Sequence, residues 1–430
     1  MNLGATADMT DRGMFVDLFA GCGGLSLGLM NAGWTGCFAV EKDPMAFETL
    51  KANLIDGPGY RFAWPAGLEK RPYEIGRFNQ RYWSLMKGLG GRVSLVAAGP
   101  PCQGFSFLGD RRKSDSRNRL YRRFLKVVEL LDPDYLLLEN VPGIDVPHGI
   151  GARRESPRPG RPTKAFSHRI RDQLLENHGY EVFGDVVRAE GCGVAQRRPR
   201  YFFVGVRSSL WNQEACPDPF DLLHKLRSDF LRDKGLDPEE PVATRDAISD
   251  LETTGRDLIP CDDYPRFKRI VYEGPETAYQ KMLHGDLNGR TPNSLRLVNH
   301  RPETVERFQR VQDECRIGVQ LRRTELRARG IRKHQLVILD PTRPAHTIST
   351  LPDDQLHYSE PRVLTVREEA RLQSFPDWFE FRGKYTTGGR RRTEEAPRYT
   401  QVGNAVAPFV GELFGRVIDE LDDILKQSKE

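Results

Sequence analysis

The 430-residue sequence lacks any apolar run approaching the roughly 18 residues that a membrane-spanning helix needs. Residues 1–4 show no positive segment followed by an apolar one, so the pattern of a secretory signal is also missing. The seven cysteines are scattered, odd in number and include no CxxC pair, which argues against a disulfide framework and a cysteine zinc site. We therefore expect a cytoplasmic protein with no membrane contact and no metal.

Composition excludes little else. With 38% hydrophobic and 29% charged residues, the chain is typical of a globular protein. The formal net charge of +5 permits a polyanionic partner without requiring one. The length allows two domains, or one large domain with an insert, and the sequence contains no internal repeat.

The first half of the chain alternates short apolar strands with helical stretches, which predicts an α/β fold with a parallel sheet. The expected strands cover 15–19, 35–41, 93–98, 135–139, 181–187 and 201–206, and the expected helices cover 25–31, 44–54, 120–131 and 167–178. This alternation is lost over 208–340. It returns with a capping box at Thr365 and Glu368 and a final amphipathic helix over 405–425.

Cys102 is the most informative residue, because it follows Pro100 and Pro101 at the end of the apolar run 93–99. The prolines force the chain out in an extended form, so the thiol is presented at the carboxyl edge of the sheet, where α/β folds place their chemistry. A cysteine held at a stiff corner suits a nucleophile. The alternative is a small buried side chain that only packs.

A glycine-rich turn follows the first expected strand and includes Phe19, Gly21 and Gly23. Glycines at that place let the backbone approach a ligand at a helix N-terminus. The spacing is not the dinucleotide fingerprint, because Ser26 stands where the third glycine belongs. Glu41 ends the second strand, where an acid accepts ribose hydroxyls, so the pair predicts an adenosine-bearing cofactor.

Two further strand ends carry charge. Glu139 follows four apolar residues, and partial desolvation there would raise its pKa, so that it could donate a hydrogen bond to a ring nitrogen. Arg198 and Arg200 precede the strand 201–206, and alternation places both on one face, where they suit a carboxylate, phosphate or carbonyl oxygen. A structural acid and a solvated charge run are the alternatives.

Six motifs then occur in a fixed order. They are 15–24, 99–106, 139–141, 196–200, 371–376 and 401–406. Together they closely resemble the C5-cytosine DNA methyltransferase family of bacterial restriction-modification systems, from about residue 15 to 415. The resemblance implies the mixed, mostly parallel Rossmann-like sheet of an S-adenosylmethionine-dependent methyltransferase, with helices on both faces and a smaller, irregular target-recognition domain.

The resemblance implies that Cys102 attacks C6 of a cytosine as a thiolate, so that C5 accepts a methyl group. Glu139 would bind N3 and the amine, Arg200 the carbonyl oxygen, and Arg198 the nucleophile loop or a phosphate. Because C5 and C6 lie within the base stack, the cytosine must be flipped out, and 103–120 suits a loop that closes over it.

The resemblance also implies S-adenosylmethionine as cofactor and S-adenosylhomocysteine as product. The corresponding contacts are Phe19, Gly21, Gly23, Glu41, Pro101, Leu120 and Asn404. Asn404 implies that the C-terminal helix packs on the N-terminal part. The family's usual acid for the adenine amine is missing from a clear position; the segment 55–92 offers only Asp56 and Glu69 in a poor pattern.

The implied division is a catalytic and cofactor-binding domain over 1–207, a target-recognition domain over 208–394 and a C-terminal segment over 395–430. Ten arginines fall within 296–333. The expected partners are double-stranded DNA and a restriction endonuclease acting on the same site, with the chain acting as a monomer. The expected DNA contacts are Gln103, Ser106, Arg322, Arg323, Arg327 and Arg329, and a second basic loop lies at 390–392.

Three other functions are alternatives. A transfer-RNA branch of the same family has a shorter middle region and a different setting around its Pro-Pro-Cys. A catalytically silent DNA-binding regulator would be expected to lose Cys102, Glu139 or Arg200, and all three are present. An amino-group DNA methyltransferase would carry Asp or Asn before Pro-Pro, where this chain has Gly99.

Overall fold

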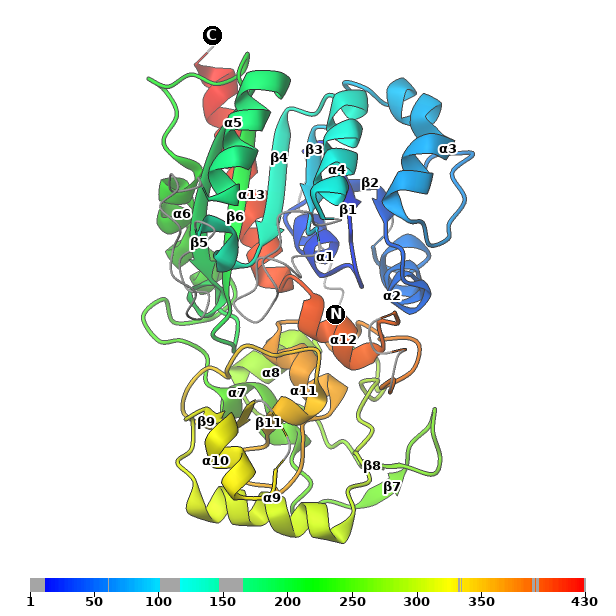
Figure 1. Ribbon diagram of the computed structural model, residues 1–430, viewed down its shortest axis with the longest axis vertical. Coiled ribbons are helices and arrows are strands. Elements are labelled where there is room, and N and C mark those ends of the chain that lie inside the picture. The colour runs from blue at the N-terminus through cyan, green and yellow to red at the C-terminus, as the bar shows by residue number, and fades with distance from the viewer. Residues whose placement is uncertain are drawn as a thin grey trace, which may run out of the picture.

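The computed structural model describes residues 12–60, 62–100, 117–146, 165–331, 333, 335–388, 391 and 394–428. Its centre is a six-stranded sheet in the order β2-β1-β3-β4-β6-β5 (Figure 1). The strands are β1 (Met14–Leu18), β2 (Thr35–Val40), β3 (Leu95–Ala98), β4 (Tyr135–Asn140), β5 (Tyr180–Arg188) and β6 (Pro199–Arg207). Strands β1 to β4 run parallel, and β6 runs antiparallel to both of its neighbours. The predicted mixed, mainly parallel sheet is therefore confirmed.

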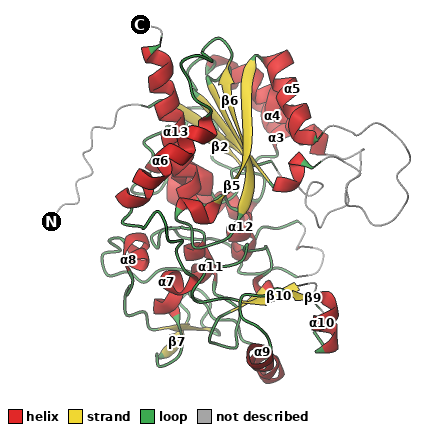
Figure 2. Ribbon diagram, turned by 90° about the vertical axis from the view of Figure 1, so that its left-hand side faces the viewer, coloured by secondary structure: helices red, strands yellow, loops and turns green. Residues whose placement is uncertain are grey.

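Helices cover both faces of the sheet, which explains why the parallel strands are apolar along nearly their whole length (Figure 2). One face carries α1 (Gly24–Asn31), α6 (Pro219–Asp233) and α13 (Pro408–Gln427); the other carries α3 (Ile75–Gly88), α4 (Arg117–Leu131) and α5 (Phe166–His178). Helix α13 packs directly on α1. A Cβ on Gly28 would lie 2.3 Å from the carbonyl oxygen of Pro408, so only glycine permits this approach.

The helix expected over 44–54 changes its winding part-way. Helix α2 (Pro44–Leu50) continues as a π-helical turn, η1 (Lys51–Ile55). The turn contains Asn53, whose buried amide pairs with the backbone of Glu380: Nδ2 donates to the carbonyl at 2.9 Å and Oδ1 accepts from the N–H at 2.8 Å. The π turn thus joins the cofactor-side helix to a segment more than 300 residues away.

The lower part of the molecule in Figure 1 is more irregular, as expected for the middle of the sequence. It holds a three-stranded sheet in the order β11-β10-β9 and a two-stranded ribbon, β7-β8. Its elements are α7 (Thr244–Ile248), η4 (Ser249–Leu251), β7 (Leu258–Pro260), β8 (Lys268–Ile270), α8 (Ala278–His284), α9 (Pro302–Glu314), β9 (Leu321–Arg322), α10 (Arg323–Ala328), β10 (Gln335–Ile338), η5 (Pro352–Asp354), β11 (Gln355–Leu356), α11 (Val366–Leu372) and α12 (Arg398–Asn404). Two other short turns, η2 (Pro142–Asp145) and η3 (Ala189–Cys192), lie against the main sheet and its helices. The division of the chain into three parts stays a prediction. Helix α6 falls within the predicted domain 208–394, but it packs against α13 and β5 of the main sheet layer.

A buried ion-pair cluster holds this lower part together. The fully buried Arg371 on α11 pairs with Asp250 of η4 and, through Nη2, with Asp377 Oδ2 at 2.7 Å. Asp377 also lies 3.0 Å from Nδ1 of His284 on α8. Because removing one partner of a buried pair strands the other charge, this cluster ties three segments into one unit. None of the described helices is both long and apolar enough to cross a membrane.

Candidate active site

Adjacent strand ends meet at one edge of the sheet. Ala98, the last residue of β3, pairs with Leu18 of β1 on one side and Leu138 of β4 on the other. Beyond it, the Gly99 N–H donates to the Leu18 carbonyl at 3.2 Å, and a Cβ on Gly99 would lie 3.6 Å from Oε2 of Glu139. The segment that leads into the Pro-Pro-Cys motif therefore emerges between the glycine-rich turn and Glu139.

Glu139 and Arg200 form an ion pair at this edge. Nε of Arg200 lies 2.8 Å from Oε1 of Glu139, and the two side chains are 18% and 12% exposed, respectively. Strand β6 makes the contact possible, because it lies antiparallel beside β4 with Glu139 in register with Phe202. The pair presents carboxyl oxygens beside guanidinium N–H groups, a complement to a planar ring that carries both an amine and a carbonyl.

Arg198 lies in a different environment from Arg200. Only 4% exposed, its guanidinium donates to the carbonyl oxygens of Ile348 at 3.1 Å, Gly403 at 2.8 Å and Ala405 at 3.2 Å. The structure engages Arg198 with backbone carbonyls of the C-terminal third of the chain, whereas Arg200 pairs with Glu139.

The glycine-rich turn is built from left-handed backbone. Phe19, Gly21 and Gly23 have φ values of 61°, 57° and 97°, and Gly23 is the N-cap of α1. The Gly21 N–H donates to Oε2 of Glu41 at 3.0 Å, while Oε1 accepts from the N–H groups of the next two residues at 2.8 and 2.7 Å. Glu41 is thereby fixed beside the turn, and its burial raises its pKa. Both parts of the predicted cofactor site lie together.

Asp17 is a component of the site that the sequence interpretation missed. It lies in β1 beneath the turn, is almost fully buried and accepts a hydrogen bond from Ser26 Oγ at 2.5 Å. Burial raises its pKa to about 7, with a further contribution from the charge of Glu41. A single acid inside the apolar strand Met14–Leu18 was the available signal.

The C-terminal motif reaches the same turn. A Cβ on Gly24 would lie 2.2 Å from the Val406 carbonyl oxygen, and Cys22 Sγ lies 3.6 Å from the Gln401 carbonyl oxygen. Asn404 is exposed at the end of α12, between the two carbonyls that Arg198 holds. Asn404 is therefore held close to the start of α1.

Several predicted residues lie outside the described ranges: Pro101, Cys102, Gln103, Ser106, and Arg390 and Arg392 of the second basic loop. Leu120 lies half-buried on α4. The two candidates for the adenine amine have cationic partners instead, since Asp56 pairs with Lys51 and Lys70, and Glu69 with Arg71 and Arg81. Within the described ranges, no three His, Cys, Asp or Glu side chains gather as metal ligands would.

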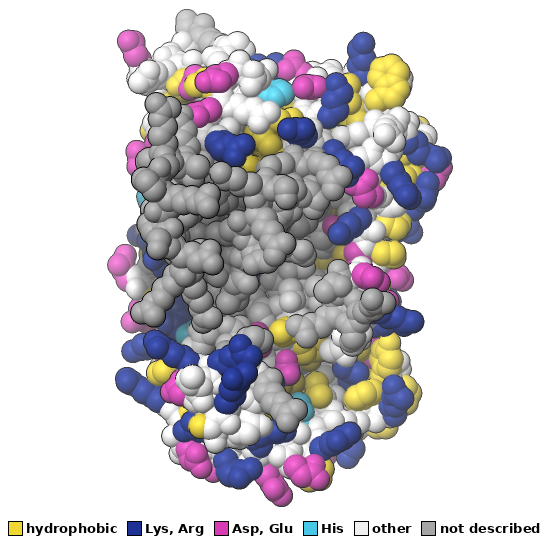
Figure 3. All heavy atoms as spheres, viewed as in Figure 1, with side chains coloured by type: hydrophobic (Ala, Val, Ile, Leu, Met, Phe, Trp, Pro, Cys, Tyr) yellow, Lys and Arg dark blue, Asp and Glu magenta, His cyan; other side chains and the backbone are white. Residues whose placement is uncertain are grey.

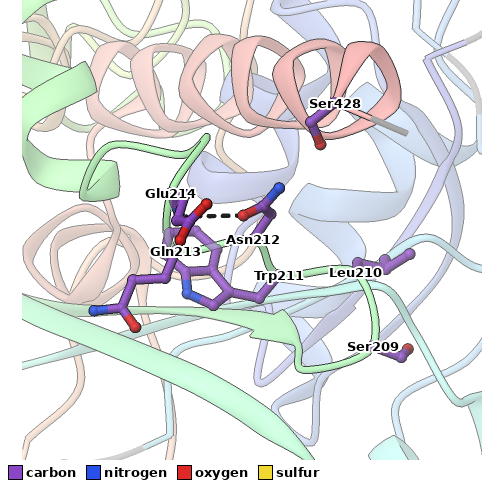
Figure 4. Close-up of a pocket in the computed structure, with 7 residues that line it drawn as sticks. All are labelled: Ser209, Leu210, Trp211, Asn212, Gln213, Glu214 and Ser428. Atoms are coloured by element: carbon purple, nitrogen blue, oxygen red, sulfur yellow. Dashed lines mark hydrogen bonds between the residues drawn. The ribbon is translucent and has the colours of Figure 1, made fainter. Parts of the chain in front are cut away.

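The predicted DNA-contacting arginines are exposed. Arg322 ends β9, Arg323 and Arg327 lie on α10, and Arg329 follows it. Figure 3 shows Lys and Arg side chains gathered at the lower left, over these elements. A surface hollow lies elsewhere, lined by residues 209–214 and Ser428 (Figure 4). Residues 209–214 come just after Arg207, the last residue of β6, whereas Arg200 lies near the first residue of that strand. The hollow therefore lies away from the strand ends described above.

Comparison with known proteins identifies the arrangement. The family model described as C-5 cytosine-specific DNA methylase matches residues 13–420. The chain belongs to this family. It is thus an S-adenosylmethionine-dependent DNA (cytosine-5-)-methyltransferase, and the resemblance seen in the sequence is confirmed.

Individual relatives span most of the methyltransferase. It is 30% identical over 428 residues to the type II methyltransferase M.XorII of Xanthomonas oryzae pv. oryzae, with 94% of this chain and 84% of the relative covered. It is 28% identical over 411 residues to M.DdeI of Desulfomicrobium norvegicum, covering 92% and 86%. A solved structure described as a DNA modification methyltransferase from an E. coli prophage matches at 25% identity and a TM-score of 0.63, covering 96% and 99%. The Dnmt2 methyltransferase of S. pombe, at 14% identity and a TM-score of 0.52 over 96% and 100%, shares the fold.

Proposed function

We propose that the methyltransferase modifies a flipped-out cytosine in a specific duplex DNA site through a covalent bond between Cys102 Sγ and C6. The observation that carries the proposal is the Glu139–Arg200 ion pair at the strand end beside Gly99, three residues before Cys102. Relatives named as type II methyltransferases support a role in protecting host DNA from a restriction endonuclease with the same site.

The chain's own groups divide the work. The Cys102 thiolate adds to C6, and the electron pair of the C5–C6 bond moves toward C5. Glu139 shares a proton with N3 and accepts a hydrogen bond from the exocyclic amine, and Arg200 donates to the carbonyl oxygen, so that the negative charge pushed into the ring is stabilised. S-adenosylmethionine, when bound, supplies the methyl group and leaves as S-adenosylhomocysteine. A base then takes the C5 proton, and Cys102 is eliminated as a thiolate.

The glycine-rich turn and its neighbours fit this cofactor. Gly21 leaves the turn open, since nothing lies within 4 Å of a Cβ there, and with Phe19 and Gly23 it would receive the methionine part. Glu41 lies where ribose hydroxyls would be bound, and Asn404 would complete the site from α12. Pro101 and Leu120 would contact the adenine from two sides. Arg198 contributes as a positioning residue, because it holds the carbonyls on both sides of Asn404.

For DNA, we propose that residues 208–394 read the sequence while 1–207 and 395–430 carry the chemistry. Arg322, Arg323, Arg327 and Arg329 would contact phosphates, and Gln103 and Ser106 would lie near the flipped base. All of these groups come from one chain, which supports action as a monomer, in the cytoplasm where host DNA lies.

The test uses duplex DNA carrying 5-fluorocytosine together with radiolabelled S-adenosylmethionine. Fluorine at C5 cannot leave as a proton does, so the wild-type protein should be trapped on labelled DNA. Cys102→Ser should give no adduct, whereas Cys315→Ser, which removes a partly exposed thiol, should be trapped like the wild type. DNA binding without any wild-type adduct would overturn the proposal in favour of a silent regulator or an RNA enzyme.

A further inference from the structure

Two exposed aliphatic side chains flank one glycine in the loop between α9 and β9. Ile317 and Val319 are each 43% exposed, and Gly318 between them has a φ of 72°. Large apolar side chains exposed together mark contact surfaces more often than ordinary surface. The loop therefore carries a small apolar tip, here defined as Ile317, Gly318 and Val319.

The backbone of the apolar tip is held firmly. The Gly318 N–H donates to the Ile338 carbonyl at 2.9 Å, and the Gly318 carbonyl lies 3.0 Å from Nε2 of His346. A Cβ on Gly318 would lie 3.1 Å from Cβ of Asp340, so there is little room for another residue. Hydrogen bonds thus fix the backbone between the two aliphatic side chains. A fixed backbone lowers the conformational entropy that is lost on binding.

The anchor of the apolar tip leads to the active site. The residues on either side of His346 pair with the segment before β6: the Arg197 N–H donates to the Ala345 carbonyl at 2.8 Å, and Thr347 Oγ1 donates to the Arg197 carbonyl at 2.7 Å. Arg197 is three residues from Arg200, which corresponds to at most about 11 Å of backbone. The apolar tip is therefore connected, through His346 and Arg197, to the strand that carries Arg200.

The charge around the apolar tip favours DNA as its occupant. Residues 316–329 contain five arginines and a single acid, Glu325, and the arginines are exposed. Figure 2 places β9 and α10 on the side of the molecule that carries α4 and α5, whereas the ribbon strand β7 lies on the opposite side. An apolar tip close in sequence to five exposed arginines suits a duplex, with phosphates outside and base edges inside the groove.

We infer that Ile317 and Val319 form a specificity-determining contact with the base pairs beside the target cytosine. The inference rests on the proposed function and names the residues through which one part of the DNA site is read. Aliphatic side chains discriminate bases by packing against the thymine methyl group or an unstacked base face, while the surrounding arginines hold the backbone.

The experiment compares wild type, the double variant Ile317→Ser, Val319→Ser, and the control Leu258→Ser. Leu258 is 40% exposed on β7, so its variant removes one aliphatic side chain of similar exposure on the other side of the molecule. Each protein is given a random-sequence duplex library, and base preference is read twice, from methylated products and from duplexes selected by binding alone. Affinity for S-adenosylhomocysteine and thermal stability are measured in parallel.

We expect the double variant to lose about tenfold in kcat/KM on the preferred site. Base preference should relax within a few base pairs of the target, while cofactor affinity stays unchanged and the control behaves as wild type. A double variant that keeps the wild-type preference in both selections would overturn the inference. If wild type methylates nothing, the proposed function fails, but the binding selection still decides whether these residues set base preference.

Discussion

Replacing Arg198 by lysine separates two roles for this residue, holding the cofactor side of the site or binding a DNA phosphate. The guanidinium donates to three carbonyl oxygens at 2.8 to 3.2 Å, on two segments. A lysine ammonium is a single compact donor and can serve at most part of that set. Leaving one or two buried carbonyls unpaired costs about 1–3 kcal/mol each, so the free energy of unfolding should fall by about 1–6 kcal/mol.

The carbonyls on both sides of Asn404 are among those released, so cofactor binding should weaken more than DNA binding. We expect the affinity for S-adenosylhomocysteine, measured by calorimetry, to fall about tenfold, which corresponds to about 1.4 kcal/mol. The affinity for duplex DNA, measured by fluorescence anisotropy, should change less than twofold. Arg188→Lys, on the exposed end of β5, serves as the control. A variant that loses DNA affinity but keeps its stability and cofactor affinity would refute this reasoning and support the phosphate role.

Three further predictions follow from the same structure. Glu139→Gln should lower kcat at least a hundredfold in a methyl-transfer assay, because it removes the carboxylate beside Arg200; an unchanged rate would contradict the assignment. Burial raises the pKa of Asp17 from 3.8 to about 7, so its contribution to stability is present at low pH and is lost as pH rises from about 4 to 7. Urea unfolding of Asp17→Asn should lack this decline, about 4 kcal/mol at most, and identical pH profiles would disprove it. Gly28→Ala should destabilise the protein by about 1–3 kcal/mol in urea unfolding, whereas Gly88→Ala, with open space around its Cβ, should not.

The six strands of the main sheet could be predicted from the sequence, but the order in which they lie side by side could not. Hydrophobic runs mark a strand wherever it lies, while strand order depends on contacts between distant segments. Strand β6 lies between β4 and β5, and this position brings Arg200 to Glu139. The local sequence around either residue does not predict this ion pair. Each charge could be proposed alone, from its place at a strand end, but the ion pair could not.

Local pattern gave the direction of some side chains but not their partners. Alternation assigned Arg198 and Arg200 to one face, but it did not show that Arg198 would be buried against backbone carbonyls of the C-terminal segment. Helix α3 was overlooked although Ile75, Phe78, Tyr82 and Met86 bury one face at helical spacing. Its exposed Trp83 and the non-helical backbone at Tyr82 obscure that period. The π turn after α2 is decided by the tertiary contact of Asn53, which no local propensity predicts.

The placement of Arg198 links the two halves of the reaction. Methyl transfer requires the reacting atoms to meet at about 3–3.5 Å, so the base and the methyl donor must be held against one common frame. Arg200, at the base edge, is two residues from Arg198, and Arg198 holds the backbone on both sides of Asn404. The same C-terminal segment packs against α1 where Gly24 and Gly28 leave space for it. The edge that we propose binds the base and the turn that we propose binds the cofactor are therefore positioned by one continuous set of short contacts, rather than by two parts of the fold that could move independently.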